Sequence, residues 1–290
     1  MPTGTTTTGS LGDSQPLIID SARIIREKEG VFQRTCDVQT LAENTGLSWE
    51  EVALAALTAE AITETTELDN PQSLSDSLFT ITPTISGIHV CITDRVYRRL
   101  SKKVISKMGQ LKQNAIQRKK DGDYLSIAAG ATTTLGGTGQ TATQGHVSAA
   151  ARRITSNTTE PAMGRIFGVF HGFVIKDFED EVKAPVGTYS MEGKSKEFYE
   201  QGFRGEIAGV AIYEAGNITI DSTPDARGMV HAKEAVVMVQ GHSPRTEPRR
   251  RPQTGGGADE VFLYDEYAYG ERSAGNWLYG MLHDATAPTS

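Results

Sequence analysis

The sequence predicts an α+β fold organised around one long helix, and three observations lead to that prediction. After Thr93 and Asp94, which are good helix N-caps, apolar side chains recur at helical spacing: Val96, Leu100, Val104, Met108, Leu111 and Ala115. Ahead of that helix lie about sixty polar, weakly periodic residues with little power to form a core of their own. Behind it, short apolar runs bounded by glycine and polar residues are typical of strands.

Length and composition are those of a soluble globular chain. Its 290 residues are 38% hydrophobic and 22% charged, and the net charge of −7 argues against a dedicated nucleic-acid binder. No stretch approaches the roughly 18 apolar residues of a membrane span, and residues 1–14 do not have the pattern of a signal peptide. Cys36 and Cys91 are the only cysteines, as expected of reduced thiols in the cytosol. We therefore expect a cytosolic product with no membrane partner.

The chain before residue 91 is expected to reach away from the body. Residues 1–20, poor in apolar side chains, predict a mobile arm, and residues 21–29 predict a short helix. The polar, weakly periodic residues from Phe32 to about Val90 predict an excursion that packs on another molecule, with a small helical patch over 49–61 followed by an acidic stretch. An alternating run then predicts a ribbon-like strand, with Leu78, Thr80 and Thr82 on one face and Phe79, Ile81 and Pro83 on the other.

The sequence predicts one long helix and not a helix bundle. If it continues to Ala129 it has about 36 residues and a length on the order of 54 Å. Gly109 and Gly122 lie inside it, where each costs about 1 kcal/mol relative to alanine and offers a place to bend.

Shorter elements follow the long helix. Residues 130–145, rich in glycine and threonine, predict a linker. The further elements that we expect are a helix over 147–157, a strand over 165–171, a helix from Gly172, and strands over 206–214, 233–241, 261–270 and 276–282. A basic, proline-rich insertion, residues 243–257, separates the last strands from the rest and predicts a solvated loop.

No catalytic, cofactor or metal site emerges from the residues. The glycine-rich run 136–145 lacks the Lys-Ser/Thr ending of a phosphate loop. The six histidines are scattered without a metal-binding spacing, and neither cysteine lies in a nucleophile motif. Ser243 lacks the second glycine and the strand-turn-helix context of a nucleophile elbow. We therefore predict that the chain is not an enzyme and binds no cofactor.

Charge patterning points instead to an interface. From Arg95 to Lys120 the chain carries ten basic residues and no acidic one, so the helix forgoes internal ion pairs and needs anions from elsewhere. The acidic stretch of the preceding loop is one source. The predicted loop contacts are Trp49, Glu60, Glu64, Glu67 and Asp69, and the predicted basic face is Arg95, Arg99, Lys102, Lys103 and Lys107. A solvated helix face and contact with DNA phosphates are the alternatives.

A second basic cluster lies in the proline-rich insertion. Arg245, Arg249, Arg250 and Arg251 are expected in a solvated loop, which would bind phosphate without reading sequence if it faced a genome.

The order of these parts resembles the tailed-phage major capsid protein family, the Hong Kong 97-type fold. Residues 81–101 (ITPTISGIHVCITDRVYRRLS) are similar to the family's passage from the returning loop strand into the spine helix. Residues 164–181 (GRIFGVFHGFVIKDFEDE) resemble its peripheral-domain strand and helix. Residues 202–218 and 226–240 resemble strands of its axial domain.

The resemblance implies a division of the whole chain. It implies an N-terminal arm over 1–35, an extended loop over 36–90, and a spine helix with the peripheral domain over 91–189. An axial domain would follow over 190–242, and residues 243–290 would hold the basic loop and C-terminal strands that return to the peripheral domain.

The function that this resemblance implies is structural. The chain would be the major capsid protein of a tailed bacteriophage, self-assembling into an icosahedral shell of pentamers and hexamers around double-stranded DNA. It would be found in the virion capsid, and in the host cytoplasm during assembly. Its partners would be copies of itself, scaffolding, portal and decoration proteins, and non-specifically the packaged DNA. The alternatives are an encapsulin-like shell that holds cargo proteins and, from another class, an α/β enzyme.

Overall fold

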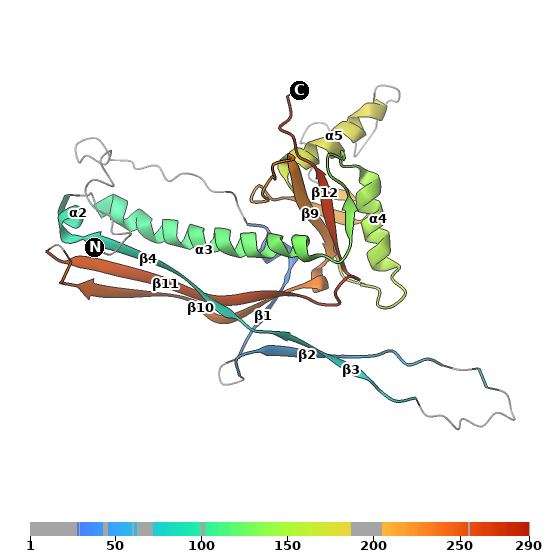
Figure 1. Ribbon diagram of the computed structural model, residues 1–290, viewed down its shortest axis with the longest axis horizontal. Coiled ribbons are helices and arrows are strands. Elements are labelled where there is room, and N and C mark those ends of the chain that lie inside the picture. The colour runs from blue at the N-terminus through green and yellow to red at the C-terminus, as the bar shows by residue number, and fades with distance from the viewer. Residues whose placement is uncertain are drawn as a thin grey trace.

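Two β-sheets and one long helix make up the body, and a hairpin projects from it (Figure 1). The computed structural model describes residues 28, 30–42, 46–59, 61–62, 72–99, 102–186, 205–254 and 256–289, without the side chains of 99, 102–108 and 182–186. A four-stranded sheet runs beside the long helix, and a six-stranded sheet lies at one end of it. The mixture of helices and strands confirms the α+β prediction.

The long helix is present, but it has 29 residues, and the predicted start of a single helix of about 36 residues is a separate short helix. Helix α2 spans Asp94–Arg99 and α3 spans Lys102–Gly130, which places the end of the helix next to the predicted Ala129. Gly109 and Gly122 lie within α3, and a Cβ atom at either position would meet no atom within 4 Å. In the described part of α3 the apolar residues at that spacing are not the buried ones, because Leu111 is 43% exposed. The residues that are buried there instead are Lys112, Ile116, Lys120, Asp121, Tyr124, Leu125 and Ala128.

The four-stranded sheet has the order β1-β10-β11-β4. Its strands are β1 (Asp37–Thr40), β10 (Val236–Arg251), β11 (Ala258–Glu271) and β4 (Thr84–Thr93). The prediction of a basic loop over 243–257 is therefore largely wrong, because β10 continues through the arginines and pairs with β11 as far as Arg251. Pro248 fits in this strand because β1 pairs with β10 only over Val237–Gln240, which leaves the proline on an open edge.

The six-stranded sheet has the order β5-β12-β9-β6-β8-β7 and forms the main core with its helices. Its strands are β5 (Thr134–Gly136), β12 (Leu278–Asp284), β9 (Asp225–Ala232), β6 (Ile166–Phe170), β8 (Val210–Glu214) and β7 (Glu206–Ile207). Helices α4 (Gln144–Thr155) and α5 (Gly172–Val186) lie against it, and η2 (Lys233–Ala235) leads into β10 (Figure 1). All five residues of β6 are buried, as expected of a strand inside a sheet with both faces covered.

Elements of this half were largely predictable. The expected helices over 147–157 and from Gly172 and the strand over 165–171 are confirmed by α4, α5 and β6. The prediction of a linker over 130–145 is wrong in part, because this segment contains the short strand β5.

A two-stranded hairpin leaves the body between β1 and β4. It consists of β2 (Trp49–Leu54) and β3 (Asp76–Ile81), paired antiparallel from Trp49↔Ile81 to Leu54↔Asp76. The predicted helical patch over 49–61 is wrong, since these residues begin with a strand. The alternation predicted from Leu78 onward is confirmed, because Ile81 and Pro83 are buried while Leu78, Thr80 and Thr82 are exposed.

Several predicted boundaries do not coincide with structural ones. The predicted arm includes Val31 and the short helix α1 (Phe32–Thr35), which is part of the core, so residues 31–35 belong to the body. The predicted boundary at residue 242 falls inside β10, and the boundary at 189 separates β6 from β8 although the two strands pair directly. The predicted helix over 21–29 lies outside the described residues except for Lys28.

Candidate subunit interface

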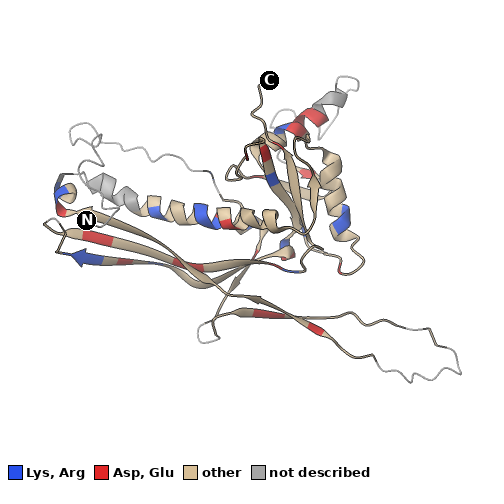
Figure 2. Cartoon of the chain, viewed as in Figure 1, with Lys and Arg blue, Asp and Glu red and all other residues tan. Residues whose placement is uncertain are grey.

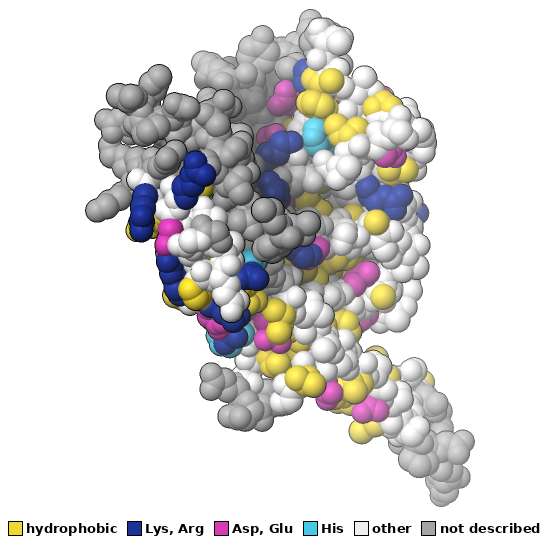
Figure 3. Space-filling view, turned by 60° about the vertical axis from the view of Figure 1, so that its left-hand side comes forward, with side chains coloured by type: hydrophobic (Ala, Val, Ile, Leu, Met, Phe, Trp, Pro, Cys, Tyr) yellow, Lys and Arg dark blue, Asp and Glu magenta, His cyan; other side chains and the backbone are white. Residues whose placement is uncertain are grey.

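The outward face of the hairpin leaves apolar side chains in solvent. Val52 pairs with Leu78, and Leu54 lies on the same face two residues along, so the three side chains form one apolar group. The exposed fraction is 56% for Val52, 61% for Leu78 and 69% for Leu54. Figure 3 shows hydrophobic side chains along the described part of the hairpin, next to the acidic ones. We call Val52, Leu54 and Leu78 the apolar patch of the hairpin.

The base of the hairpin is fixed to the body. The rings of Trp49 and Phe79 meet edge to face with centroids 6.2 Å apart, and both pack on a small core made by Ile81, Val237 and Val239. Trp49, predicted to contact a neighbouring molecule, is thus half-buried against its own subunit.

An arginine adds a polar connection at the same place. The Nε atom of Arg272 donates to Glu51 Oε2 at 2.8 Å, and its Nη1 atom donates to the carbonyl of Glu234 at 2.9 Å. The hairpin therefore starts from a fixed base, while the apolar patch beyond it has no cover.

The other predicted loop contacts cannot be placed in the fold. Glu60, Glu64, Glu67 and Asp69 lie outside the described residues, between the distal ends of β2 and β3.

The predicted basic face lies at the far end of the molecule from the hairpin. Arg95 is exposed on α2, which lies with the far ends of β10 and β11 at one end of the long axis (Figures 1 and 2). The side chains of Arg99, Lys102, Lys103 and Lys107 are outside the described part, although their backbone is helical. The hairpin of one molecule therefore does not meet its own α2.

Two lysines of the long helix find their anions within the same molecule. Lys120 Nζ lies 2.7 Å from Asp265 Oδ2 of β11, with both side chains almost fully buried, and 5.0 Å from the ring centroid of Tyr267. Lys119 pairs with Asp123 at 2.8 Å, one turn along α3. The expectation that the helix forgoes internal ion pairs is therefore wrong for Lys119, whose partner Asp123 lies just past the run of basic residues. Lys120 does find its anion outside the helix, but on β11 of the same molecule.

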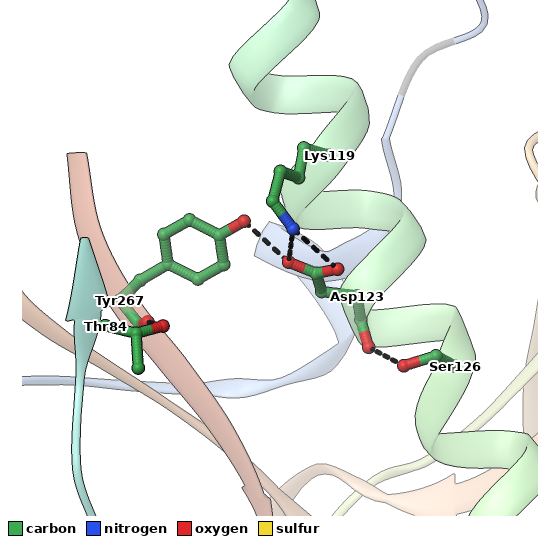
Figure 4. A network of polar contacts seen from close by, with 5 residues as sticks. All are labelled: Thr84, Lys119, Asp123, Ser126 and Tyr267. Atoms are coloured by element: carbon green, nitrogen blue, oxygen red, sulfur yellow. Dashed lines mark hydrogen bonds and ion pairs between the residues drawn. The ribbon is translucent and has the colours of Figure 1, made fainter. Parts of the chain in front are cut away.

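These contacts form a polar network between α3 and the four-stranded sheet (Figure 4). The hydroxyl of Tyr267 donates to Asp123 Oδ2 at 2.7 Å, and burial together with that carboxylate raises the pKa of Tyr267 above its usual value. Ser126 Oγ donates to the backbone carbonyl of Asp123 at 2.6 Å, and Thr84 Oγ1 donates to the carbonyl of Tyr267 at 3.5 Å. The network fixes the register of the helix against β11 and β4.

The arginines of β10 are largely paired as well. Arg250 forms a two-pronged contact with Asp94 at the start of α2 and also reaches Asp259 at 2.9 Å. This guanidinium lowers the pKa of Asp94, and the two carboxylates raise the pKa of Arg250. The remaining pairs are Arg251 with Glu260 at 3.0 Å and Arg245 with Glu247 at 3.3 Å. Arg249 is exposed on the strand.

A chain of hydrogen bonds joins α1, α3 and β9. Thr35 Oγ1 lies 2.6 Å from the Tyr124 hydroxyl, which lies 2.7 Å from His231 Nε2. His231 Nδ1 lies 2.8 Å from the carbonyl of Ala232 and donates to it, so Nε2 accepts from Tyr124. Burial lowers the pKa of His231 to about 4, which keeps the ring neutral in this arrangement.

A second histidine is buried on β12. His283 Nε2 lies 3.2 Å from His146 Nδ1 of α4, and the side chain of His283 is fully buried. Burial and the neighbouring His146 lower the pKa of His283 to about 4.

Reactive groups do not gather in the described part of the chain. Three or more His, Cys, Asp or Glu side chains in an arrangement fit for a metal ion do not occur among the described residues. Cys36 and Cys91 are free and buried, and burial raises the pKa of Cys36 to about 12. No described helix is long and apolar enough to cross a membrane.

The comparisons with known proteins agree with this architecture. No protein-family model and no curated protein sequence matches the chain. Among solved structures, the head structure of Helicobacter pylori bacteriophage KHP40 superposes with a TM-score of 0.73 at 11% identity, over 91% of this chain and 94% of that one. This chain has a phage capsid fold. The expectation of a Hong Kong 97-type architecture is thereby confirmed.

Further phage structures give the same result over almost the whole length. The capsid of the cyanophage P-SCSP1u matches with a TM-score of 0.68 at 12% identity, covering 92% of both chains. The mature capsid of bacteriophage PhiM1 matches with a TM-score of 0.65 at 14% identity, over 93% of this chain and 90% of that one. The capsid fold thus includes the hairpin, the long helix and both sheets.

Proposed function

We propose that this protein is the major capsid protein of a tailed double-stranded DNA phage. Copies of it would assemble into an icosahedral shell of pentamers and hexamers around the genome, without catalysis. The protein would assemble in the host cytoplasm and remain in the virion capsid. The observation that supports this most directly is the projecting hairpin, whose apolar patch has no partner among the described residues of its own subunit.

The energetics of the hairpin favour a contact with a second molecule. An isolated two-stranded hairpin is at best marginally stable in water, and exposed apolar groups of this kind mark interaction sites. Covering a valine or leucine side chain contributes about 1.5–3 kcal/mol. Val52, Leu54 and Leu78 therefore supply enough apolar surface for a lateral contact that is repeated many times in a shell.

The shape of the molecule favours closed assemblies. The hairpin and the basic end with α2 lie far apart on the long axis, so a contact between them joins two different surfaces on two copies (Figure 2). Such head-to-tail contacts generate rings when the rotation closes. In this arrangement Glu60, Glu64, Glu67 and Asp69 of one copy would lie over Arg95, Arg99, Lys102, Lys103 and Lys107 of the next.

Contacts with other components follow from the same proposal. The protein would contact the packaged DNA through non-specific interactions with its phosphates. Within the set Arg245, Arg249, Arg250 and Arg251, the exposed Arg249 is the best placed for this, since the other three have carboxylate partners. Scaffolding, portal and decoration proteins are the further partners that such a shell would take. The encapsulin-like alternative is less well supported, because the similar structures reported above are phage capsids and heads.

Electron microscopy and sedimentation of the purified protein test the proposal. We expect closed shells, or rings of five and six subunits that convert to shells. A matched variant replaces residues 56–74 by an Asn-Gly turn, which can close the hairpin where the Ala55 amide donates to the Ser75 carbonyl at 2.9 Å. This variant should remain folded. Because it keeps Val52, Leu54 and Leu78, it should still assemble, at a higher protein concentration than the wild type. A wild-type protein that stays monomeric at high concentration, with no assembly in the presence of co-expressed phage head proteins, would contradict the capsid function.

A further inference from the structure

The chain enters the body through a narrow passage between α3 and the loop that follows β8. On the loop side, Lys28 Nζ donates to the carbonyl of Gly216. On the helix side, a Cβ atom on Gly30 would come within 3.1 Å of Asp121 Oδ1, so the backbone passes close to that carboxylate. Immediately afterwards the chain is anchored, because Phe32 is 2% exposed and lies in the main core.

Asp121 binds both walls of this passage. Its Oδ1 atom accepts from the backbone N–H of Val31 at 2.8 Å, and its Oδ2 atom accepts from Asn217 Nδ2 at 2.8 Å. The side chain is fully buried, and within the described part of the chain both of these donors are neutral groups. One side chain of the long helix therefore joins the incoming chain to the loop that follows β8.

A gain in stability does not explain why the Asp121 carboxylate is buried here. Burial of a carboxylate without a cation is costly, and an apolar side chain of similar size would fill the same volume without that cost. What the carboxylate adds is direction, because its bond from the Val31 N–H fixes where the backbone passes along the helix, while Asn217 holds its other oxygen. Buried polar groups of this kind can specify one geometry among several close alternatives.

We propose that Asp121 is a positioning residue for assembly, which sets the point and direction at which the amino-terminal arm leaves the body. This rests on the proposed capsid function, in which that arm reaches a neighbouring subunit. A shell built of identical chains needs each arm to start from the same place, even where its course further on differs. Asp121 supplies that starting point, while Phe32 and the core hold the chain that follows.

Two variants at this position test the proposal. Asp121→Ala removes the acceptor and leaves the Val31 N–H unpaired, so we expect the Val31 amide to exchange with solvent at least about tenfold faster. Asp121→Asn keeps an oxygen for Val31, and its amide can donate to a rotated Asn217. It should retain slow exchange. In assembly reactions, Asp121→Ala should give a broadened distribution of shell diameters, and Asp121→Asn should give the wild-type distribution.

A control variant separates positioning from general stability. Tyr124→Phe, one turn along the same face of α3, removes the hydroxyl between Thr35 and His231 but leaves the two bonds of Asp121 intact. It should lower the melting temperature and leave both the Val31 exchange rate and the shell diameter unchanged. Unchanged Val31 exchange in Asp121→Ala, or the same broad shells from Tyr124→Phe, would overturn the proposal. The exchange measurement needs no assembly, so it remains decisive even if the wild-type protein forms no shell.

Discussion

The hairpin and the junction of α3 with the two sheets differ in where their side chains find partners. At the junction, buried polar groups of α3 find their partners within the same molecule: Lys120 pairs with Asp265, and Tyr124 with Thr35 and His231. On the hairpin, apolar side chains remain uncovered on the outward face. Polar contacts therefore fix the shape of the subunit, whereas uncovered apolar surface remains available to join one subunit to another.

This difference predicts which substitutions affect folding and which affect assembly. Changes to the apolar patch of the hairpin should leave the subunit stable and prevent assembly. Changes at the junction should lower the stability of the subunit itself.

The largest expected effect is the loss of shells when the apolar patch is made acidic. The double variant Val52→Asp, Leu78→Asp places two carboxylates where we propose that a neighbour packs, and a buried unpaired charge is far costlier than the contact it replaces. Assembly should be abolished at every salt concentration. Because both positions are exposed in the subunit, its free energy of unfolding should change by less than about 0.5 kcal/mol. Sedimentation velocity and urea unfolding measure the two quantities.

A control on the same hairpin uses its other face. Ser77→Asp adds a carboxylate at an exposed position that pairs with Ala53, on the face opposite the apolar patch. Shells should still form. If Ser77→Asp prevents assembly as completely as the double variant does, added charge and not the apolar patch is responsible.

The next largest effect is expected at the junction. Lys120→Met leaves Asp265 buried without its cation, which should cost about 3–5 kcal/mol in the free energy of unfolding. The double variant Lys120→Met, Asp265→Leu removes both charges and should recover most of that loss. Urea unfolding of the single and double variants measures how much of the lost free energy of unfolding is due to the unpaired Asp265 charge. Equal destabilisation by the two would show that the ion pair contributes nothing beyond packing volume.

The same contrast explains what could be predicted from the sequence. Strands and helices whose apolar residues face their own core, such as β6 and α5, follow a periodicity that can be read directly. The apolar face of α3 was placed wrongly because its buried face contains Lys112, Lys120 and Asp121, whose burial depends on partners distant in the sequence. Local pattern cannot identify such partners.

The arginines of β10 illustrate a second limit. Residues 243–251 contain two prolines and four arginines, a composition typical of loops, yet they form a strand because β11 provides a continuous pairing partner. Of the predicted interface residues, Trp49 is at the hairpin base and Arg95 is exposed on α2, as the structure describes them. Their contacts with a second subunit remain predictions.

A smaller effect concerns the pH dependence of the subunit. The pKa values of His231 and His283 are lowered to about 4 in the folded protein, against about 6.5 in the unfolded chain. Their contribution to stability is therefore fully present above pH 6.5 and is lost as the pH falls toward 4, because the unfolded chain binds protons first. Each histidine accounts for at most about 3 kcal/mol. Thermal unfolding between pH 7 and 4 should show this loss, and His283→Gln should reduce it.

The smallest expected effect concerns the charges of Glu64 and Glu67, which we propose to pair with the basic helix of a neighbour. Charge reversal by Glu64→Lys and Glu67→Lys should raise the protein concentration needed for assembly several-fold at low salt, since each exposed pair contributes about 0.2–1 kcal/mol. At roughly 1 M salt, where the screening length falls to about 3 Å, variant and wild type should assemble alike. Adding Lys103→Glu and Lys107→Glu should restore low-salt assembly if the two regions meet. Identical assembly of the Glu→Lys variant and the wild type at low salt would show that the apolar patch alone holds the hairpin to its neighbour.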